Sequence, residues 1–298
     1  MAGFGCGAAE TYISLVMARK SDSSYCAEQV RTHDGDRYLC GLFAPEPRRR
    51  ALFALYAFNI EVARIREAVS EPLLGHIRLQ WWREAILGIY EGSSRDHPVV
   101  RALADAIERF DLSRTYFDRL IEARGFDLDD SPPENLPALK RYVEETSANL
   151  ILLALEALEV REGRTFWAGR HVGVAWALTG LLRAVPSHAR AKRLYLPADL
   201  MEKEGVRKAD RFELKPSAGL AAVARTLAGE AREHLAQARA LSRHVPRQAV
   251  PALLPATLAE AYLRRMERRG FNLFDPRLGL SKPGRQLRLA WAAFRNRY

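Results

Sequence analysis

The sequence predicts an all-α fold, on the basis of composition and of the absence of hairpin signals. The chain has 298 residues, 48% of them hydrophobic, and is rich in Ala, Leu, Arg and Glu, which favour helices. Asp34-Gly35 is its one Asp-Gly pair, and no Asn-Gly pair occurs between runs of alternating hydrophobicity. We therefore expect helices and no sheet, with a length that suits one large core.

The first long helix is expected from about Arg49 to Ser70. Pro45 and Pro47 suit its start, because a proline in the first turn removes only an amide that would be unpaired. Glu71-Pro72 ends it, since proline disfavours helical geometry in the residue before it. Apolar residues fall on nearly every side of this helix, which predicts that its neighbours bury it. The polar residues within it, which need partners or water, are Asn59, Glu61, Arg64, Arg66 and Glu67.

The rest of the chain divides into further helices joined by short connectors. A tryptophan-bearing helix ends near 91–94, and the clearest loop is 127–137, with three prolines. Pro186 should end a helix soon after Arg183, and Gly169, Gly173 and Gly180 in that helix should allow close helix approach. The other expected helices begin near 98 and 198 or cover 113–124, 138–158, 164–182, 217–244, 250–269 and 284–297.

We expect one domain over 31–298, after a poorly defined N-terminal extension over 1–30 in which Met17 is an alternative start. The three cysteines lack CxxC spacing, which indicates a reducing compartment rather than a disulfide framework. No stretch is long enough to span a membrane, and the first 20 residues resemble neither a signal nor a transit peptide. These features predict a cytoplasmic protein, with at most a peripheral contact to a membrane.

Most of the positive charge lies at the C-terminus. The net charge is +10, and 264–298 contains ten basic residues against two acidic ones. Such a region is either a solvated surface or a contact for an anionic membrane or an acidic protein. A nucleic-acid partner is not expected, because no helix-turn-helix, zinc or aromatic stacking motif accompanies the charge.

Two motifs resemble the squalene/phytoene synthase family. The first comprises Tyr38-Leu39, Phe43-Ala44-Pro45, Arg48-Arg49-Arg50, the run 54–58 and Trp82-Arg83-Glu84, and the second lies within 173–197. The resemblance implies an isoprenoid synthase fold, which is a single helical bundle around a central cavity.

The sequence departs from the catalytic pattern of that family at its acidic motifs. In catalytic members, aspartates four residues apart on two facing helices hold the magnesium ions that bind a prenyl diphosphate. The matching positions here are Ala63, Arg64 and Glu67 in the first motif, and Ala184 and His188 in the second. Only Glu67 is acidic, so the resemblance implies no catalytic residue, no bound metal and no cofactor.

A non-catalytic branch of the family shows the same departures. The runs 57–63, 69–71, 182–186 and 271–276 are similar to the mitochondrial assembly factors of respiratory complex I. This similarity implies a scaffold function, with a complex I subunit or assembly intermediate as partner. The alternative is a divergent head-to-head prenyl transferase that uses Glu67 as its remaining motif acid.

Basic residues near the motif positions suggest an anionic ligand. Basic residues on the two sides would repel one another unless an anion lay between them. They are Arg64 and Arg66 on one side, and Arg183, Arg190, Lys192 and Arg193 on the other. A prenyl diphosphate or phospholipid bound without metal would fit, because arginine donates two hydrogen bonds to phosphate. The residues that the resemblance implies for this ligand site are Tyr56, Arg183, Arg193 and Tyr195. Alternatively, Arg64 and Arg66 pair with nearby glutamates.

Two further polar patterns occur in the predicted helices. Tyr142, Glu145 and Asn149 recur at helical spacing, which predicts either the lining of the central cavity or a hydrogen-bonded seam between helices. His171 and His188 lack a third ligand at useful spacing, so they do not predict a metal site.

Overall fold

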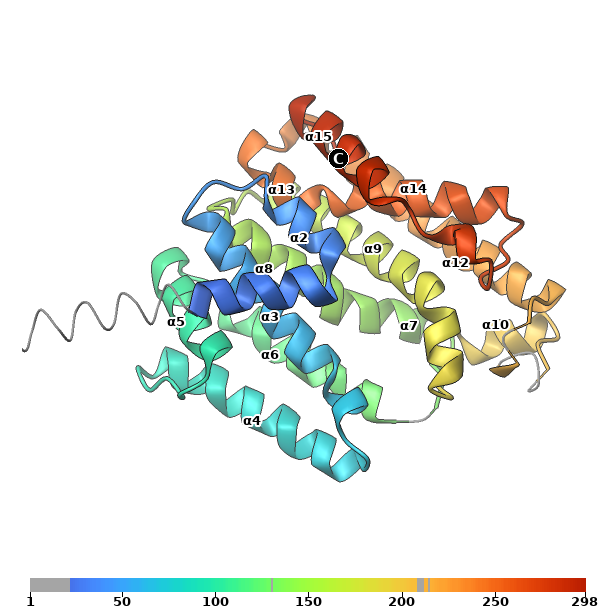
Figure 1. Ribbon diagram of the computed structural model, residues 1–298, viewed down its shortest axis with the longest axis horizontal. Helices are drawn as coiled ribbons and strands as arrows, with labels where there is room; N and C mark the ends of the chain where they lie inside the picture. Colours follow the sequence, from blue (N-terminus) through green and yellow to red (C-terminus); the bar gives the residue numbers. More distant parts are fainter. Residues whose placement is uncertain (1–21, 130, 208–211, 214) are drawn as a thin grey trace, which may run out of the picture.

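The computed structural model describes residues 22–129, 131–207, 212–213 and 215–298, and every regular element in these ranges is a helix. The all-α prediction is confirmed (Figure 1). The first half contains a helix at 22–33, α2 (Gly35–Gly41), α3 (Arg48–Ala63), a 3-10 turn (Ile65–Ala68), α4 (Pro72–Tyr90), α5 (Pro98–Phe110), α6 (Arg114–Ala123) and a 3-10 turn (Arg124–Leu128). The second half contains α7 (Leu136–Val143), a π turn (Glu144–Ala148), α8 (Asn149–Ala157), α9 (Gly163–Arg190), α10 (Ala198–Lys203), α12 (Ala218–Ala240), α13 (Val250–Leu253), α14 (Pro255–Arg268) and α15 (Lys282–Phe294).

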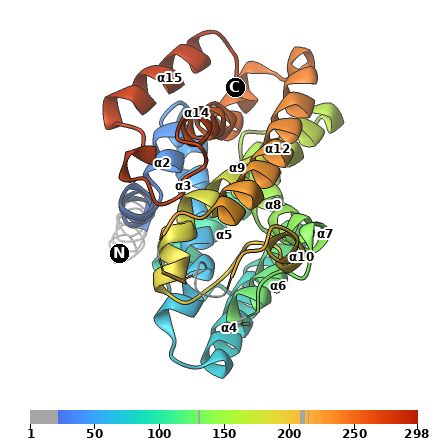
Figure 2. The same ribbon diagram turned by 90° about the vertical axis from the view of Figure 1, so that its right-hand side faces the viewer.

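The long helix α9 is the centre of the bundle. It packs against α8, α12 and α14 and runs through the middle of the molecule (Figures 1 and 2). Gly173 allows this packing, because a Cβ atom there would lie 2.4 Å from the Cα of Ala148. A Cβ at Gly169 would lie 2.7 Å from Leu155 Cδ1, so both glycines allow close helix approach as predicted. Gly180 does not, since open space surrounds it.

The helix α9 also continues past the point where it was predicted to end. Pro186 lies inside it, and the helix reaches Arg190. A proline removes one backbone hydrogen bond, but its fixed φ is compatible with helical geometry. Val185 and Ala189 are buried, so core packing holds the last turn in place.

The prediction for the first long helix was right about its burial and wrong about its end. Eleven residues of α3 are buried, including Tyr56 and Asn59. The helix ends at Ala63 rather than Ser70, because the chain tightens into a 3-10 turn where Arg64 and Glu67 become exposed.

The predicted helix over 250–269 is divided in two. Pro255 is the first residue of α14, and the preceding Leu254 separates it from α13. A proline lacks the amide that would continue the hydrogen bonds of α13. The chain therefore restarts as a new helix at this point.

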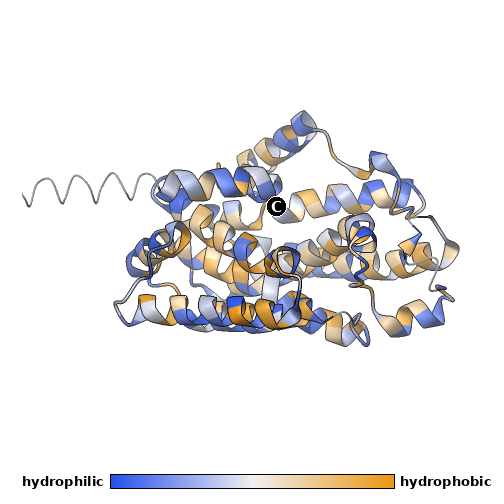
Figure 3. Ribbon diagram, turned by 60° about the horizontal axis from the view of Figure 1, so that its bottom comes forward, coloured by the Kyte–Doolittle hydropathy of each residue, from blue (hydrophilic) through white to orange (hydrophobic). Residues whose placement is uncertain are grey.

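The outer helices lie at opposite sides of the bundle, with α4 on one side and α15 on the other (Figures 1 and 2). Hydrophobic residues concentrate in the inner helices (Figure 3).

Of the extension predicted over 1–30, residues 1–21, including Met17, lie outside the described residues. Residues 22–30 belong to a helix whose Cys26 and Val30 are fully buried. Among the described helices, none is both long and apolar enough to cross a membrane.

Candidate functional site

The first motif lies at the exposed end of α3. The side chain of Arg64 is 49% exposed and that of Glu67 is 60% exposed, and Arg64 Nε lies 3.2 Å from Glu67 Oε2. Arg64 Nη1 also lies 3.1 Å from the ring nitrogens of His33. Ala63 offers no polar atom. The only acidic side chain of this motif is therefore engaged in the local arginine pairing that the sequence analysis held as an alternative.

The second motif lies on the last turns of α9 and is not acidic. Ala184 and His188 are both half-buried there. Burial lowers the pKa of His188 to about 4, and Arg193 acts in the same direction against the opposing effect of Asp127. His188 is consequently neutral at pH 7, and its ring lies 4.5 Å from that of Tyr195 between centroids. The pocket beside these rings has a volume of only about 10 Å³.

A buried carboxylate that sequence analysis missed lies beside the second motif. Asp127 is 6% exposed. Its Oδ1 accepts hydrogen bonds from the hydroxyls of Tyr142, at 2.6 Å, and Tyr195, at 2.9 Å. Its Oδ2 accepts one from Arg124 Nη1 at 3.1 Å, and Arg124 also donates to Tyr142 and to Asn59 on α3. These contacts form the Asp127 cluster, defined as Asp127, Arg124, Tyr142, Tyr195 and Asn59.

The charges of the Asp127 cluster are balanced internally. Burial, followed by the neighbouring Asp127 carboxylate, raises the pKa of Tyr195, so its hydroxyl remains a donor. Arg124 supplies a positive charge to the same carboxylate. The cluster joins α3, α7 and the segment after α9. One carboxylate makes this connection by bonding to an arginine and two tyrosines. Within the described ranges, no group of three or more His, Cys, Asp or Glu side chains is placed to hold a metal ion.

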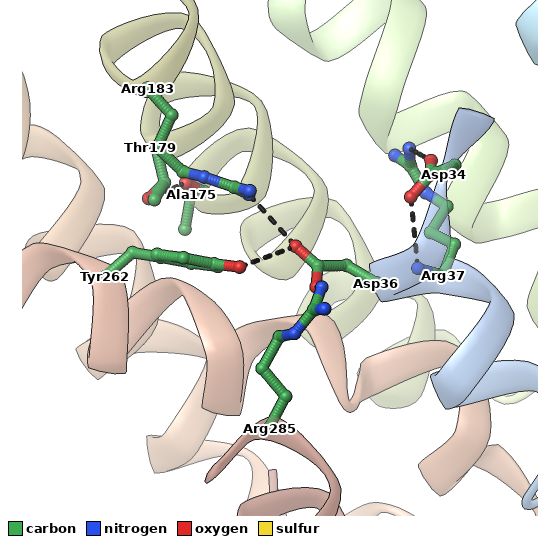
Figure 4. Close-up of polar contacts among 8 residues, drawn as sticks. All are labelled: Asp34, Asp36, Arg37, Ala175, Thr179, Arg183, Tyr262 and Arg285. Atoms are coloured by element: carbon green, nitrogen blue, oxygen red, sulfur yellow. Dashed lines mark hydrogen bonds and ion pairs between the residues drawn. The ribbon is translucent and has the colours of Figure 1, made fainter. Parts of the chain in front are cut away.

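A second buried carboxylate connects α2 to three other helices. Asp36 Oδ2 accepts hydrogen bonds from Tyr262 of α14, at 2.9 Å, and Arg183 of α9, at 3.1 Å. Its Oδ1 accepts one from Arg285 of α15 at 2.6 Å (Figure 4). Burial raises the pKa of Tyr262 to about 12, with Asp36 adding to the rise and Arg183 opposing it. We call Asp36, Arg183, Tyr262 and Arg285 the Asp36 cluster.

The four residues predicted to bind a ligand fall into two groups. Arg183 belongs to the Asp36 cluster, and Tyr56 is fully buried nearby, with the guanidinium of Arg37 lying 5.8 Å from its ring centroid. The Tyr56 hydroxyl has no hydrogen-bond partner among the described residues. Tyr195 belongs to the Asp127 cluster. Arg193 follows α9 and donates to the carbonyl oxygen of Arg66 at 3.1 Å.

The polar stripe on 138–158 is internal. Tyr142 joins the Asp127 cluster, whereas Asn149 donates to the backbone and carboxylate oxygens of Glu145 in the preceding π turn, at 2.9 and 3.0 Å. Tyr142 thus forms part of the predicted seam between helices.

Asp127 had one weak signal in the sequence. It stands between the apolar residues Phe126 and Leu128 at the start of the predicted loop 127–137.

Comparison with solved structures defines the class of fold. A dehydrosqualene synthase crystallised in complex with ligand matches with a TM-score of 0.82, over 93% of this chain and 97% of that chain, at 21% sequence identity. The protein therefore has the all-α isoprenoid synthase fold.

The chain belongs to the squalene/phytoene synthase family, whose sequence profile matches residues 30–284. A bovine (Bos taurus) relative named NADH dehydrogenase (ubiquinone) complex I, assembly factor 6, is 34% identical over 274 residues, covering 92% of this chain and 82% of the relative. A presqualene diphosphate synthase of Rhodopseudomonas palustris is 27% identical over 231 residues, covering 76% of this chain and 81% of the relative. The family resemblance expected from the two motifs is confirmed.

Proposed function

We propose that this protein is a non-catalytic assembly factor of respiratory complex I that retains the fold of a prenyl transferase. The observation that carries the proposal is the set of residues at the acidic motif positions, where Glu67 alone is acidic and is paired with Arg64. The similarity to the bovine assembly factor, over 92% of this chain, supports the assembly role.

The motif residues are a poor match to magnesium chemistry. Magnesium requires a near-octahedral set of oxygen ligands, of which proteins usually supply carboxylates. Ala63 and Ala184 offer no side-chain ligand, and His188 offers a nitrogen. The Asp127 carboxylate is already bonded to Arg124, Tyr142 and Tyr195. A divalent ion would have to displace these donors, so the proposal includes neither a metal nor another cofactor.

The second candidate function is a divergent head-to-head prenyl transferase. It is favoured by the family assignment and by the similarity to a presqualene diphosphate synthase. Diphosphate release from farnesyl and geranylgeranyl diphosphate, measured in magnesium and in EDTA, separates the two functions. We expect no release in either buffer from folded protein. Magnesium-dependent release that is lost in Glu67→Ala would instead establish the transferase.

An anionic isoprenoid diphosphate or lipid is part of the proposal as a bound ligand. Arg183 is 32% exposed, so it can reach an anion if it gives up its bond to Asp36. Arg193 can do the same by releasing the carbonyl of Arg66. Tyr56 and Tyr195 complete the proposed set.

Equilibrium binding of farnesyl diphosphate in EDTA tests this ligand. We expect Arg193→Ala to weaken binding, whereas Arg114→Ala, at an exposed ion pair on α6, should leave it unchanged. No binding by the parent protein would remove the ligand from the proposal without affecting the assembly role.

The proposed partner is a complex I subunit or assembly intermediate. The proposed location is the cytoplasm, with a peripheral contact to the inner membrane through the basic C-terminal region. Deleting the gene should lower the amount of assembled complex I in native gels, and expression of the Glu67→Ala variant should restore it. Full complex I content in the deletion strain would contradict the assembly role.

A further inference from the structure

The last described helix, α15, has one side that packs on the bundle and one apolar side that is exposed. Its inner side carries Leu289, which is fully buried, and Arg285, which is bonded to Asp36. Its outer side carries Leu287, Trp291 and Phe294, whose exposures are 72%, 61% and 77%. These three residues are spaced by four and three positions, so they form one stripe along the helix. The helix is therefore anchored on the bundle while its outer stripe remains uncovered.

The apolar surface continues from α15 onto neighbouring segments. Leu42 and Phe43, in the connection between α2 and α3, are 41% and 40% exposed. A groove of about 710 Å³ separates this connection from α15, and both Phe43 and Phe294 line it. Its other apolar walls are Pro45, Pro246, Val250, Pro251, Ala290 and Ala293. We call the stripe together with Leu42 and Phe43 the α15 apolar face.

Positive charge borders the α15 apolar face along one edge and at the groove. From Lys282 to the C-terminal Tyr298 there are five basic residues and no acidic one. Arg288 and Arg295 are seven positions apart, so both lie along the same edge of the stripe. The Arg295 guanidinium lies 5.3 Å from the ring centroid of Trp291. Arg247 adds a charge at the wall of the groove, where Arg48 is paired with Glu159.

We propose that the α15 apolar face binds the surface of an anionic lipid bilayer. A stripe of Leu, Trp and Phe beside arginines is typical of helices that lie in the membrane interface. Tryptophan favours the headgroup region, and arginine can extend its charge to lipid phosphates while its stem stays on apolar surface. The absence of acidic residues on α15 gives charge complementarity to anionic lipids. This inference rests on the membrane contact of the proposed function and assigns that contact to specific residues.

Vesicle cosedimentation tests the charge requirement. We expect the full chain to bind phosphatidylcholine vesicles that contain phosphatidylglycerol and to bind pure phosphatidylcholine vesicles much more weakly. The double variant Arg288→Glu with Arg295→Glu should bind the anionic vesicles at least roughly 30-fold more weakly, from the contribution of two basic residues near an anionic surface. The matched control, Arg78→Glu with Arg83→Glu, reverses two exposed charges on α4 at the opposite side of the bundle and should bind as the parent does (Figure 1).

Lipids with brominated acyl chains test insertion of the stripe. They should quench part of the tryptophan fluorescence of the parent protein, and that part should disappear in Trp291→Phe, which keeps an apolar side chain. Trp291→Gln with Phe294→Gln should abolish vesicle binding. Trp167 on α9 has a similar exposure (58%), and Trp167→Gln should leave vesicle binding intact. Circular dichroism would confirm that each variant is folded.

Three outcomes would overturn the inference. In the first, the folded parent does not bind vesicles. In the second, it binds neutral and anionic vesicles equally. In the third, the α15 variants and the control variants lose vesicle binding to the same extent. A protein partner for this face would give the first outcome. Complex I content in the deletion strain is measured independently, so failure here can be distinguished from failure of the assembly role.

Discussion

The guanidinium of Arg183 lies over the ring of Tyr262, 3.7 Å from its centroid, and both side chains bond to the same oxygen of Asp36. Arg183 thus has a counter-charge and an aromatic contact inside the protein. An anionic ligand would have to compete with both. The Asp36 cluster also fixes α15 through Arg285, so it supports the helix that carries the proposed membrane contact.

Asp36→Asn should destabilise the fold by about 3 kcal/mol, because it removes the negative charge shared by two partly buried arginines. Urea denaturation would measure this change. Asp118→Asn, at an exposed pair with Arg114, is the control and should change the free energy of unfolding by less than about 1 kcal/mol. Equal effects of the two variants would show that the Asp36 cluster contributes no more to the free energy of unfolding than a surface ion pair does.

Asp127→Asn should lower the free energy of unfolding by about 3 to 5 kcal/mol, since it leaves Arg124, whose side chain is only 14% exposed, without a counter-charge. Asp129→Asn makes the same chemical change two residues away at an exposed position, and we expect an effect within about 0.5 kcal/mol. The readout is again the free energy of unfolding in urea. A loss below about 1 kcal/mol in Asp127→Asn would mean that the cluster is not held by charge.

Much of the fold could be predicted from local chemistry. The prolines before α3 and the small residues on α9 act through the backbone near them, so their effects are visible in sequence. The continuation of α9 past Pro186 depends on the burial of Val185 and Ala189 by other helices. A local rule for proline cannot anticipate that packing.

The site was less predictable for the same reason. Helical spacing places Ala184 and His188 near one another without knowledge of the fold, because both lie on α9. Asp36 and Arg285, in contrast, are 249 positions apart and meet only because α15 packs against α2. Arg285 could be recognised from sequence only as one basic residue among many.

Gly173→Ala should destabilise the protein by about 1 to 3 kcal/mol or more, because the new Cβ would meet the backbone of Ala148. Gly180 lies seven residues further along the same helix and has open space around its Cα. Gly180→Ala should therefore stabilise by roughly 0.5 to 1 kcal/mol, through the better helix propensity of alanine. Thermal denaturation of both variants would test the pair. A Gly173→Ala variant as stable as the parent would show that the π turn at Glu144–Ala148 and α9 can separate at little cost.

A histidine pair, of which His234 is buried and His171 half-buried, should make stability depend on pH. His171 on α9 and His234 on α12 approach within 2.9 Å between their Nδ1 atoms. Burial lowers the pKa of both, with His171 adding to the effect at His234, whose pKa falls to about 4. Nearby charges also face the pair, from Arg170, Glu144, Lys140 and Glu230.

The lowered pKa sets the direction of the pH effect. The unfolded chain takes up a proton on His234 near pH 6.5, and the folded protein does so only near pH 4. The contribution of neutral His234 is therefore fully present above pH 6.5 and is lost as the pH falls to about 4, by up to about 3 kcal/mol. His234→Gln should show a smaller loss of unfolding free energy across this range, whereas His76→Gln, at an exposed position, should follow the parent. Parallel curves for the parent and His234→Gln would refute the assignment to this pair.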